Sequence, residues 1–170
     1  MIIYIGADHR GFALKETIKA HLIDTGMEVV DLGNDILEEG DDYPDFAAAV
    51  ADAVSMNPEE DRGIVLCGSG VGVDIVANKI IDIRSALALS ADQIRAARTD
   101  DNVNVLALAA DFLDEAGAKQ IVTTFIETEY DEAEQHQRRI DKITELELGP
   151  MTGESSLETE AVAPEEEVEQ

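Results

Sequence analysis

Short, almost wholly apolar runs alternate along this chain with longer segments of helical periodicity. Strands that are apolar on both faces are typical of parallel sheets covered by helices on each side. The alternation therefore predicts an α/β fold, a three-layer α/β/α sandwich. The expected strands are residues 2–5, 27–32, 63–67, 84–89 and 104–108, and the expected helices are 11–23, 43–54, 73–80, 92–98, 113–127 and 132–146.

Right-handed crossovers leave few ways of ordering five parallel strands. We expect a Rossmann-like sheet of order 2-1-3-4-5 with an added C-terminal helix. In that order the first and third strands are neighbours, and ligands bind where their carboxyl ends meet. Asp8 and His9 follow the first strand, and the third strand runs into Cys67, Gly68 and Ser69. The fold thus predicts one crevice that holds the most reactive side chains of the chain.

We place the folded domain at residues 1–148. Residues 149–170 contain many glutamates, no Lys or Arg and no aromatic residue. Such a segment cannot bury enough apolar area to offset the entropy of ordering it. We interpret it as an acidic, disordered, solubilising tail.

The formal net charge of −26 argues against nucleic acid and anionic membranes as partners, since both require a basic footprint. The charge suits a salt-rich cell interior, but solubility alone explains it more simply. A single cysteine excludes an internal disulfide and a Cys-based zinc site. The start of the chain lacks the pattern of a signal peptide, and no apolar run has transmembrane length. We expect a cytoplasmic protein.

The loop Gly68-Ser69-Gly70-Val71-Gly72 follows the third strand and precedes a helix. Its glycines let backbone N–H groups approach a ligand, and the helix directs further free N–H groups to the same place. The loop therefore predicts a hole for phosphate or for a developing oxyanion. A simple tight turn remains an alternative, and the Walker ending Gly-Lys-Ser/Thr is absent.

Cys67 stands directly before this loop, where free N–H groups would stabilise a thiolate. A cysteine at this position serves either as a base toward a carbon acid or as a nucleophile toward a carbonyl. A buried structural cysteine is the alternative. The proximity of Ser69, Asp8 and His9 favours a catalytic role. A response regulator of related fold needs Asp at the position of Cys67, which argues against that class.

Several blocks follow one another in the chain: residues 5–12 (IGADHRGF) with Leu14-Lys15, 42–47 (DYPDFA), 63–72 (GIVLCGSGVG), 77–79 (ANK), 104–108 (NVLAL) and 136–140 (HQRRI). In sequence and order these blocks resemble the type B ribose-5-phosphate isomerases and the related galactose-6-phosphate isomerases. The resemblance covers residues 2–145.

The resemblance implies a cofactor- and metal-free aldose–ketose isomerase of pentose phosphate metabolism, acting as a homodimer or a tetramer with sites near the subunit interface. The proton moves between C1 and C2 of an open-chain sugar phosphate through an enediol. Cys67 is then the base and Ser69 assists it. The implied substrate-binding residues are the loop amides from Gly68 through Gly70 and Val71 to Gly72, together with Asp8, His9, Tyr43, Asp101 and Arg139.

Three positions depart from the family pattern. Asp100 stands where the family has the histidine that opens the sugar ring, and Asp111 and Gln135 stand where it has arginines. A carboxylate at 111 would repel phosphate. We therefore retain three hypotheses. The first is an active sugar-phosphate isomerase with Asp100 as the ring-opening group, the second a non-catalytic sugar-binding or regulatory relative, and the third an isomerase of a less anionic or unphosphorylated sugar.

Overall fold

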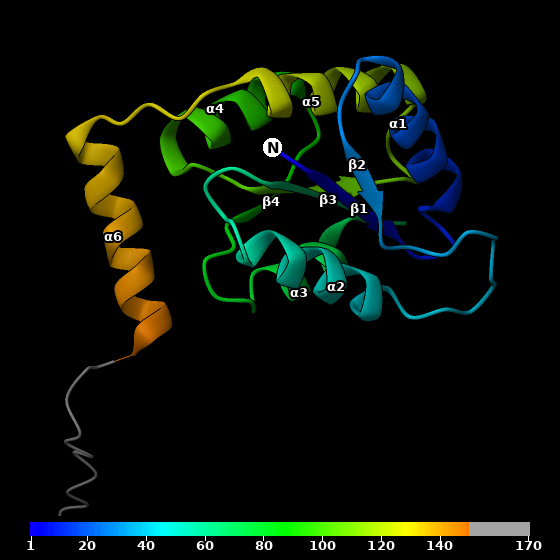
Figure 1. Cartoon of the computed structure of the whole chain (residues 1–170), viewed down its shortest axis with the longest axis horizontal. Helices are drawn as coiled ribbons and strands as arrows, with labels where there is room; N and C mark the ends of the chain where they lie inside the picture. Colours follow the sequence, from blue (N-terminus) through cyan, green and yellow to red (C-terminus); the bar gives the residue numbers. More distant parts are fainter. Residues whose placement is uncertain (150–170) are drawn as a thin grey trace, which may run out of the picture.

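The computed structural model describes residues 1–149, which form a parallel sheet between two layers of helices (Figure 1). The predicted acidic tail lies outside the described residues from position 150 onward. The strands are β1 (Ile3–Ala7), β2 (Val29–Asp31), β3 (Arg62–Cys67), β4 (Ser85–Leu87) and β5 (Val105–Ala109). The helices are α1 (Phe12–Asp24), α2 (Tyr43–Ser55), α3 (Val71–Ala77), α4 (Ala91–Asp101), α5 (Glu115–Glu127) and α6 (Glu134–Leu148).

The five strands are parallel and stand in the order β2-β1-β3-β5-β4, so the expected α/β class is confirmed. The last two strands are exchanged relative to the expected order 2-1-3-4-5. β5 has all five residues buried and takes the interior place beside β3. β4 has only three residues, each partly exposed, and forms the edge. Burial on both faces therefore decided which strand lies inside.

Each face of the sheet carries its own apolar core. Helices α2 and α3 cover one face, whereas α1, α4 and α5 cover the other, as Figure 1 shows below and above the strands. Apolar residues along each strand alternate between the two cores, as Ile64 and Val65 of β3 do. Cys67, at the end of β3, belongs to the α2/α3 side.

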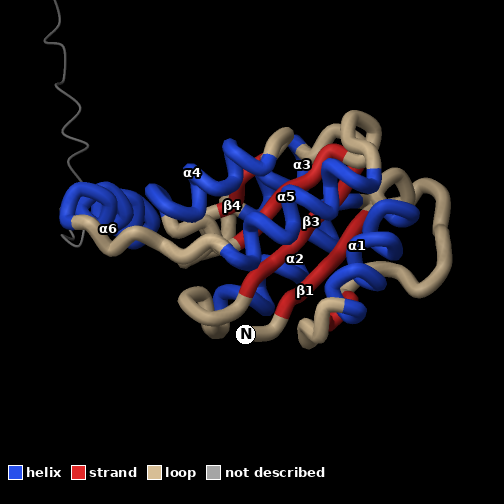
Figure 2. Tube along the Cα trace, turned by 90° about the horizontal axis from the view of Figure 1, so that it is seen from above, coloured by secondary structure: helices blue, strands red, loops and turns tan. Residues whose placement is uncertain are grey.

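Helix α6 stands apart from these layers, beyond the β4 edge and next to α4 (Figure 2).

The buried guanidinium of Arg98 connects the end of α4 to the start of β5. Its Nη1 donates to Asn102 Oδ1 at 2.8 Å and to the Val103 carbonyl at 2.6 Å, and its Nε donates to the Thr128 carbonyl at 3.2 Å. Within residues 1–149, no helix combines the length and the apolar character needed to cross a membrane.

A fully buried lysine joins α1 to β2. Lys15 Nζ lies 2.6 Å from Asp31 Oδ2, 2.8 Å from Glu16 Oε1 and 3.1 Å from the Asn34 carbonyl oxygen, and Lys19 also reaches Asp31 at 2.6 Å. Burial raises the pKa of Asp31, but hydrogen bonds from the two lysines outweigh it and hold the pKa below its usual 3.8. Lys15 thus anchors the end of β2 and the segment that follows it to α1.

Candidate active site

The turn between β1 and α1 rests directly on the backbone of β3. A side chain at Gly11 would come within 2.9 Å of the Leu66 carbonyl carbon and oxygen, so only glycine allows this approach. The buried Asp8 carboxylate stabilises the turn, since its Oδ1 accepts from Arg10 N at 3.0 Å and from Gly11 N at 2.9 Å. The register, with Ala7 beside Leu66, places Asp8 and Cys67 at the same edge of the sheet.

Cys67 is buried, with 5 % of its surface exposed, and it is a free cysteine. The backbone N–H of Gly70 donates to its Sγ at 3.2 Å, and its carbonyl accepts from Ala110 N at 2.9 Å. Gly70 adopts φ +73°, and a Cβ there would meet Ala109 N and the Leu108 carbonyl carbon at 3.0 Å. The loop is therefore folded tightly against the end of β5, with an N–H group aimed at the sulfur.

The remaining predicted members of the loop follow Cys67 directly along the chain. Ser69 and Val71 are exposed, whereas Gly68 is buried. The ring of Tyr43, at the start of α2, lies over Gly72, where an added Cβ would be 2.6 Å from its ring carbons. Val71 and Gly72 form the first turn of α3, whose N–H groups have no partner within the helix. The loop thus presents backbone donors beside Cys67 and under the tyrosine.

His9 is fixed by a carboxylate from the loop between β2 and α2. Asp41 Oδ1 accepts from His9 N at 2.8 Å and lies 2.7 Å from Nδ1, and Asp41 Oδ2 accepts from the Asn34 side-chain amide at 3.1 Å. The hydrogen bond that Asp41 accepts from the ring of His9 raises the pKa of His9 above its usual 6.5. Burial lowers this pKa by less, and the charge of Asp8 adds to the rise. A protonated His9 would be suited to bind an anion.

The two residues that flank Gly68 on its outer side are Arg10 and Asp111. The Arg10 guanidinium forms an ion pair with the Asp111 carboxylate and lies against Gly68, where an added Cβ would clash with it. Asp111 N donates to the Gly68 carbonyl at 3.0 Å. Asp111 is thus paired with a cation, which reduces the repulsion of phosphate expected from the sequence.

Asp100, Asp101 and Arg139 lie elsewhere in the same chain. Asp100 and Asp101 end α4 and precede the amino end of β5, whereas Cys67 is in register with Ala109 at the carboxyl end of β5. At roughly 3.3 Å per residue, β5 alone separates these ends by about 13 Å. Asp100 Oδ1 lies 3.8 Å from His136 Nε2, on the same helix α6 that carries the exposed Arg139. A single chain therefore does not bring these three residues to Cys67.

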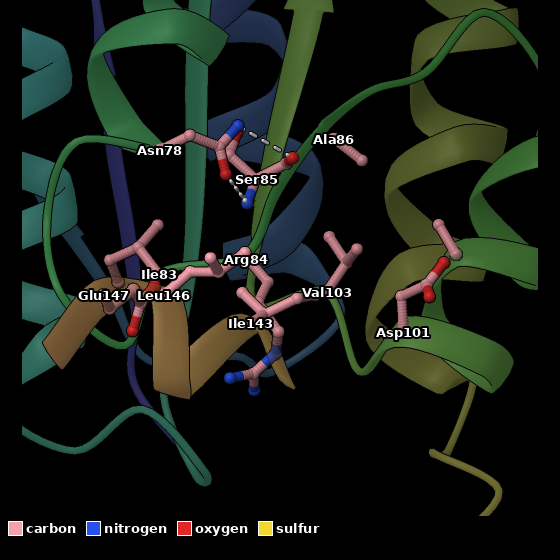
Figure 3. A pocket seen from close by; sticks show the side chains of 11 residues that line it. Asn78, Ile83, Arg84, Ser85, Ala86, Asp101, Val103, Ile143, Leu146 and Glu147 are labelled. Carbon is pink, nitrogen blue, oxygen red and sulfur yellow. Dashed lines mark hydrogen bonds between the residues drawn. The ribbon is translucent and has the colours of Figure 1, made fainter. Parts of the chain in front are cut away.

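A cavity of about 480 Å³ opens between the β4 edge, the end of α4 and α6 (Figure 3). Arg84, Asp101, Val103, Ile143 and Leu146 are among the residues that line it, so the predicted substrate-binding residue Asp101 faces this space. No residue of the Cys67 loop belongs to its lining. In residues 1–149, no group of three or more His, Cys, Asp or Glu side chains is arranged to hold a metal ion.

Two polar residues at the site were missed by the sequence reasoning. Asp41 lies in the irregular loop before α2, and nothing in the spacing of that loop indicates that it reaches His9. Arg10 belongs to the run 5–12, but its contact with Asp111, 101 positions away, needs the exchanged strand order that puts β5 next to β3. The sequence did offer one signal for this pair. Asp111 replaces an arginine of the family pattern, and Arg10 could supply the positive charge that this replacement removes.

Comparisons with known proteins identify the family of this chain. Residues 3–143 match the Ribose/Galactose Isomerase family. The chain is 44% identical over 145 residues to the probable ribose-5-phosphate isomerase B of Mycoplasma genitalium, covering 85% of this chain and 95% of that protein. It is 40% identical over 145 residues to the ribose-5-phosphate isomerase B of Escherichia coli, with the same coverage of 85% and 95%.

Solved structures lead to the same family. The crystal structure of the Mycoplasma genitalium ribose-5-phosphate isomerase B with bound ribulose-5-phosphate superposes with a TM-score of 0.84 at 43% identity, covering 86% of this chain and 96% of that chain. The ribose 5-phosphate isomerase of Thermotoga maritima gives a TM-score of 0.79 at 42% identity, with 85% and 97% covered. The chain described here therefore belongs to the ribose/galactose isomerase family of aldose–ketose isomerases.

Proposed function

We propose that this protein interconverts ribose 5-phosphate and ribulose 5-phosphate without a cofactor, with Cys67 as the base. The observation that carries the proposal is the buried Cys67 sulfur, which accepts an N–H bond from Gly70 at 3.2 Å at the carboxyl edge of the sheet. A relative at 43% identity was crystallised with ribulose-5-phosphate, which supports this substrate over an unphosphorylated sugar.

The reaction needs one base and one oxyanion site. The Cys67 thiolate removes the proton from C2 of the open-chain aldose and returns it to C1, while the O2 proton moves to O1. Ser69, two residues after Cys67 and exposed, is assigned to assist this second transfer. Because the Gly70 N–H already stabilises the sulfur, the amides of Val71 and Gly72 stabilise the enediolate oxygen. Asp8 Oδ2 and Tyr43 hold sugar hydroxyls.

Asp100 is proposed as the acid–base group that opens the sugar ring. Ribose 5-phosphate closes into a hemiacetal, and opening it needs a proton donor and acceptor near the ring oxygen. Asp100 is half-exposed, and its Oδ1 lies 3.8 Å from Nε2 of His136, so the imidazole is a close neighbour of the proposed acid–base group. Asp101 and Arg139 then bind the substrate beside it.

These roles require a second copy of the chain. Asp100, Asp101 and Arg139 lie at the opposite end of β5 from Cys67, so one chain cannot apply both groups to one substrate. A symmetric dimer can place the α4/α6 end of one copy over the Cys67 edge of the other. Helix α6 favours this arrangement, since it stands off its own sheet with Ile143, Leu146 and Leu148 exposed. We accordingly propose a homodimer.

The direct test is conversion of ribose 5-phosphate to ribulose 5-phosphate by the purified full-length protein, followed by incorporation of solvent deuterium at the exchanged carbon. The panel should include hexose 6-phosphates and the matching unphosphorylated sugars. Turnover of a phosphorylated sugar supports the proposal. Calorimetric binding without turnover would identify a non-catalytic relative, and turnover of free sugars alone would assign a different substrate.

The proposed pairing of chains predicts complementation between two inactive variants. Cys67→Ala lacks the base, whereas Asp100→Ala/Arg139→Ala lacks the groups contributed by the other copy. If equal amounts are unfolded together and refolded, about a quarter of the wild-type activity should return, because half of the dimers are mixed and each contains one intact site. The single-variant samples carried through the same procedure are the controls. Activity no higher than the sum of these controls would place all the catalytic groups in one chain.

The pH dependence of KM should report on His9. If protonated His9 binds the phosphate, KM rises as the pH increases through the pKa of His9, which Asp41 raises above 6.5. Asp41→Asn keeps an acceptor for His9 N but removes the charge, so the rise should begin at a lower pH. The measurement is KM against pH from about 7 to about 9, where the phosphate is mostly a dianion. Asp45→Asn, an exposed change at the start of α2, is the charge-matched control, and superimposable profiles for Asp41→Asn and wild type would rule out this role.

A further inference from the structure

Arg10 occupies a defined place over the catalytic loop. Its guanidinium lies against Gly68, the residue that follows Cys67, and is paired with the Asp111 carboxylate at the end of β5. The side chains of Arg10 and Asp111 remain 56% and 38% exposed, so the guanidinium is open to a ligand from the solvent side.

The backbone around this ion pair is fixed on both sides. Arg10 N donates to Asp8 Oδ1 at 3.0 Å, within the turn that rests on β3. Asp111 N donates to the Gly68 carbonyl at 3.0 Å, and Ala110 N donates to the Cys67 carbonyl at 2.9 Å. Exposed ion pairs are usually worth little to stability, because two long side chains must be ordered to form them. Here these backbone hydrogen bonds already order the main chain at both Arg10 and Asp111. The ion pair therefore holds the Arg10 guanidinium near Cys67.

The charges around the loop make this cation valuable to an anionic substrate. In a chain of net charge −26, the carboxylates of Asp8, Asp41 and Asp111 all lie close to the loop. Arg10 is a permanent cation among them, and His9 becomes one when it is protonated. A guanidinium has five N–H donors in a planar fork that fits phosphate oxygens, and one bond to Asp111 leaves others available. The ion pair with Asp111 fixes the orientation of the Arg10 guanidinium.

We propose that Arg10 binds the phosphate of the substrate, with Asp111 as the residue that positions its guanidinium. This assignment rests on the proposed function. It adds a phosphate-binding residue that belongs to the same chain as Cys67. The carboxylate at 111, which by itself would repel phosphate, acts instead through the arginine it holds. His9 and Arg10 then approach the phosphate from neighbouring positions of one turn.

The test compares Arg10→Ala, Arg10→Lys, Asp111→Ala and Arg95→Ala, the last an exposed arginine of α4 that serves as control. Arg10→Ala should raise KM for ribose 5-phosphate and the inhibition constant of inorganic phosphate by roughly 10-fold, with a much smaller change in kcat. Arg10→Lys should recover only part of the loss, because it restores charge without the fork. Asp111→Ala should show a smaller rise, and Arg95→Ala none. Thermal unfolding checks that each variant is folded.

A charge exchange adds a rescue experiment. Arg10→Asp combined with Asp111→Arg returns a guanidinium to the same pair from the β5 side, so its KM should be lower than that of Arg10→Asp alone. Calorimetry with inorganic phosphate separates this inference from the proposed function, since it needs no turnover. If the wild type binds phosphate and Arg10→Ala binds it much more weakly, the inference holds even for an inactive protein. Equal phosphate affinity and equal KM in wild type and Arg10→Ala would overturn it, as would absence of phosphate binding by the wild type.

Discussion

Replacing Cys67 with alanine should lower kcat for isomerisation by about 10³-fold while the protein remains folded, since a positioned general base contributes typically between 10² and 10⁴. The sulfur is buried and receives the Gly70 N–H bond, and we propose it as the group that moves the proton between C1 and C2. The measurement is steady-state conversion of ribose 5-phosphate, with deuterium exchange at C1 of ribulose 5-phosphate as a second readout.

The matched variant is Cys67→Ser, which keeps the shape of the side chain but offers an alcohol far less acidic than a thiol. It should be nearly as inactive as Cys67→Ala, and both should still bind phosphate, because His9 and Arg10 are intact. Ser69→Ala should cost less than either, as a change in an assisting group. If Cys67→Ala or Cys67→Ser turned over at a rate near that of the wild type, another base would have to be sought.

Replacing Asp31 with alanine should lower the free energy of unfolding by about 3–4 kcal/mol, because it leaves the ammonium of Lys15 buried without its main partner. Lys15→Met should cost no more than about half of that, since Asp31 keeps Lys19 at 2.6 Å and the Gly33 N–H at 2.9 Å. Urea unfolding at neutral pH measures both variants. Equal losses in the two would contradict the claim that the buried cation is the costlier group.

Asp31 also makes the free energy of unfolding depend on pH. Because the pKa of Asp31 is held below 3.8 in the folded protein, its contribution to stability is present above that pH and is lost as the pH falls through the lowered value. Asp31→Ala should lack this part of the acid-induced loss. Unfolding free energies of wild type and variant should therefore converge in acid and diverge toward neutral pH.

The sheet and the edge that carries the site could be predicted because continuous apolar runs and glycines report on local structure directly. The runs that became β1, β3 and β5 are apolar on both faces, and Gly68 and Gly70 mark the loop. The order of β4 and β5 could not be predicted in this way, because both have apolar residues and only their relative burial decides which strand is inside.

The site itself could be predicted only in part, because several residues that contact one another there are far apart in the sequence. Asp8 and Cys67 end adjacent strands, so topology places them together. The contacts of His9 with Asp41 and of Arg10 with Asp111 span 32 and 101 positions and involve irregular segments, where no periodicity indicates which atoms meet. The buried role of Lys15 was also hidden, because nothing in its position along the helix indicates that Asp31 and Asn34 reach it.

The contact of Gly11 with the Leu66 backbone has a consequence for how such a protein can diversify. With no side chain between them, the turn bearing Asp8 and the strand bearing Cys67 form one rigid piece, and substitutions cannot adjust their spacing. Selectivity for one sugar over another must then be tuned from the periphery, by segments such as residues 32–42 and 110–114 that surround this piece without being part of it. Engineering of new substrates is best begun there.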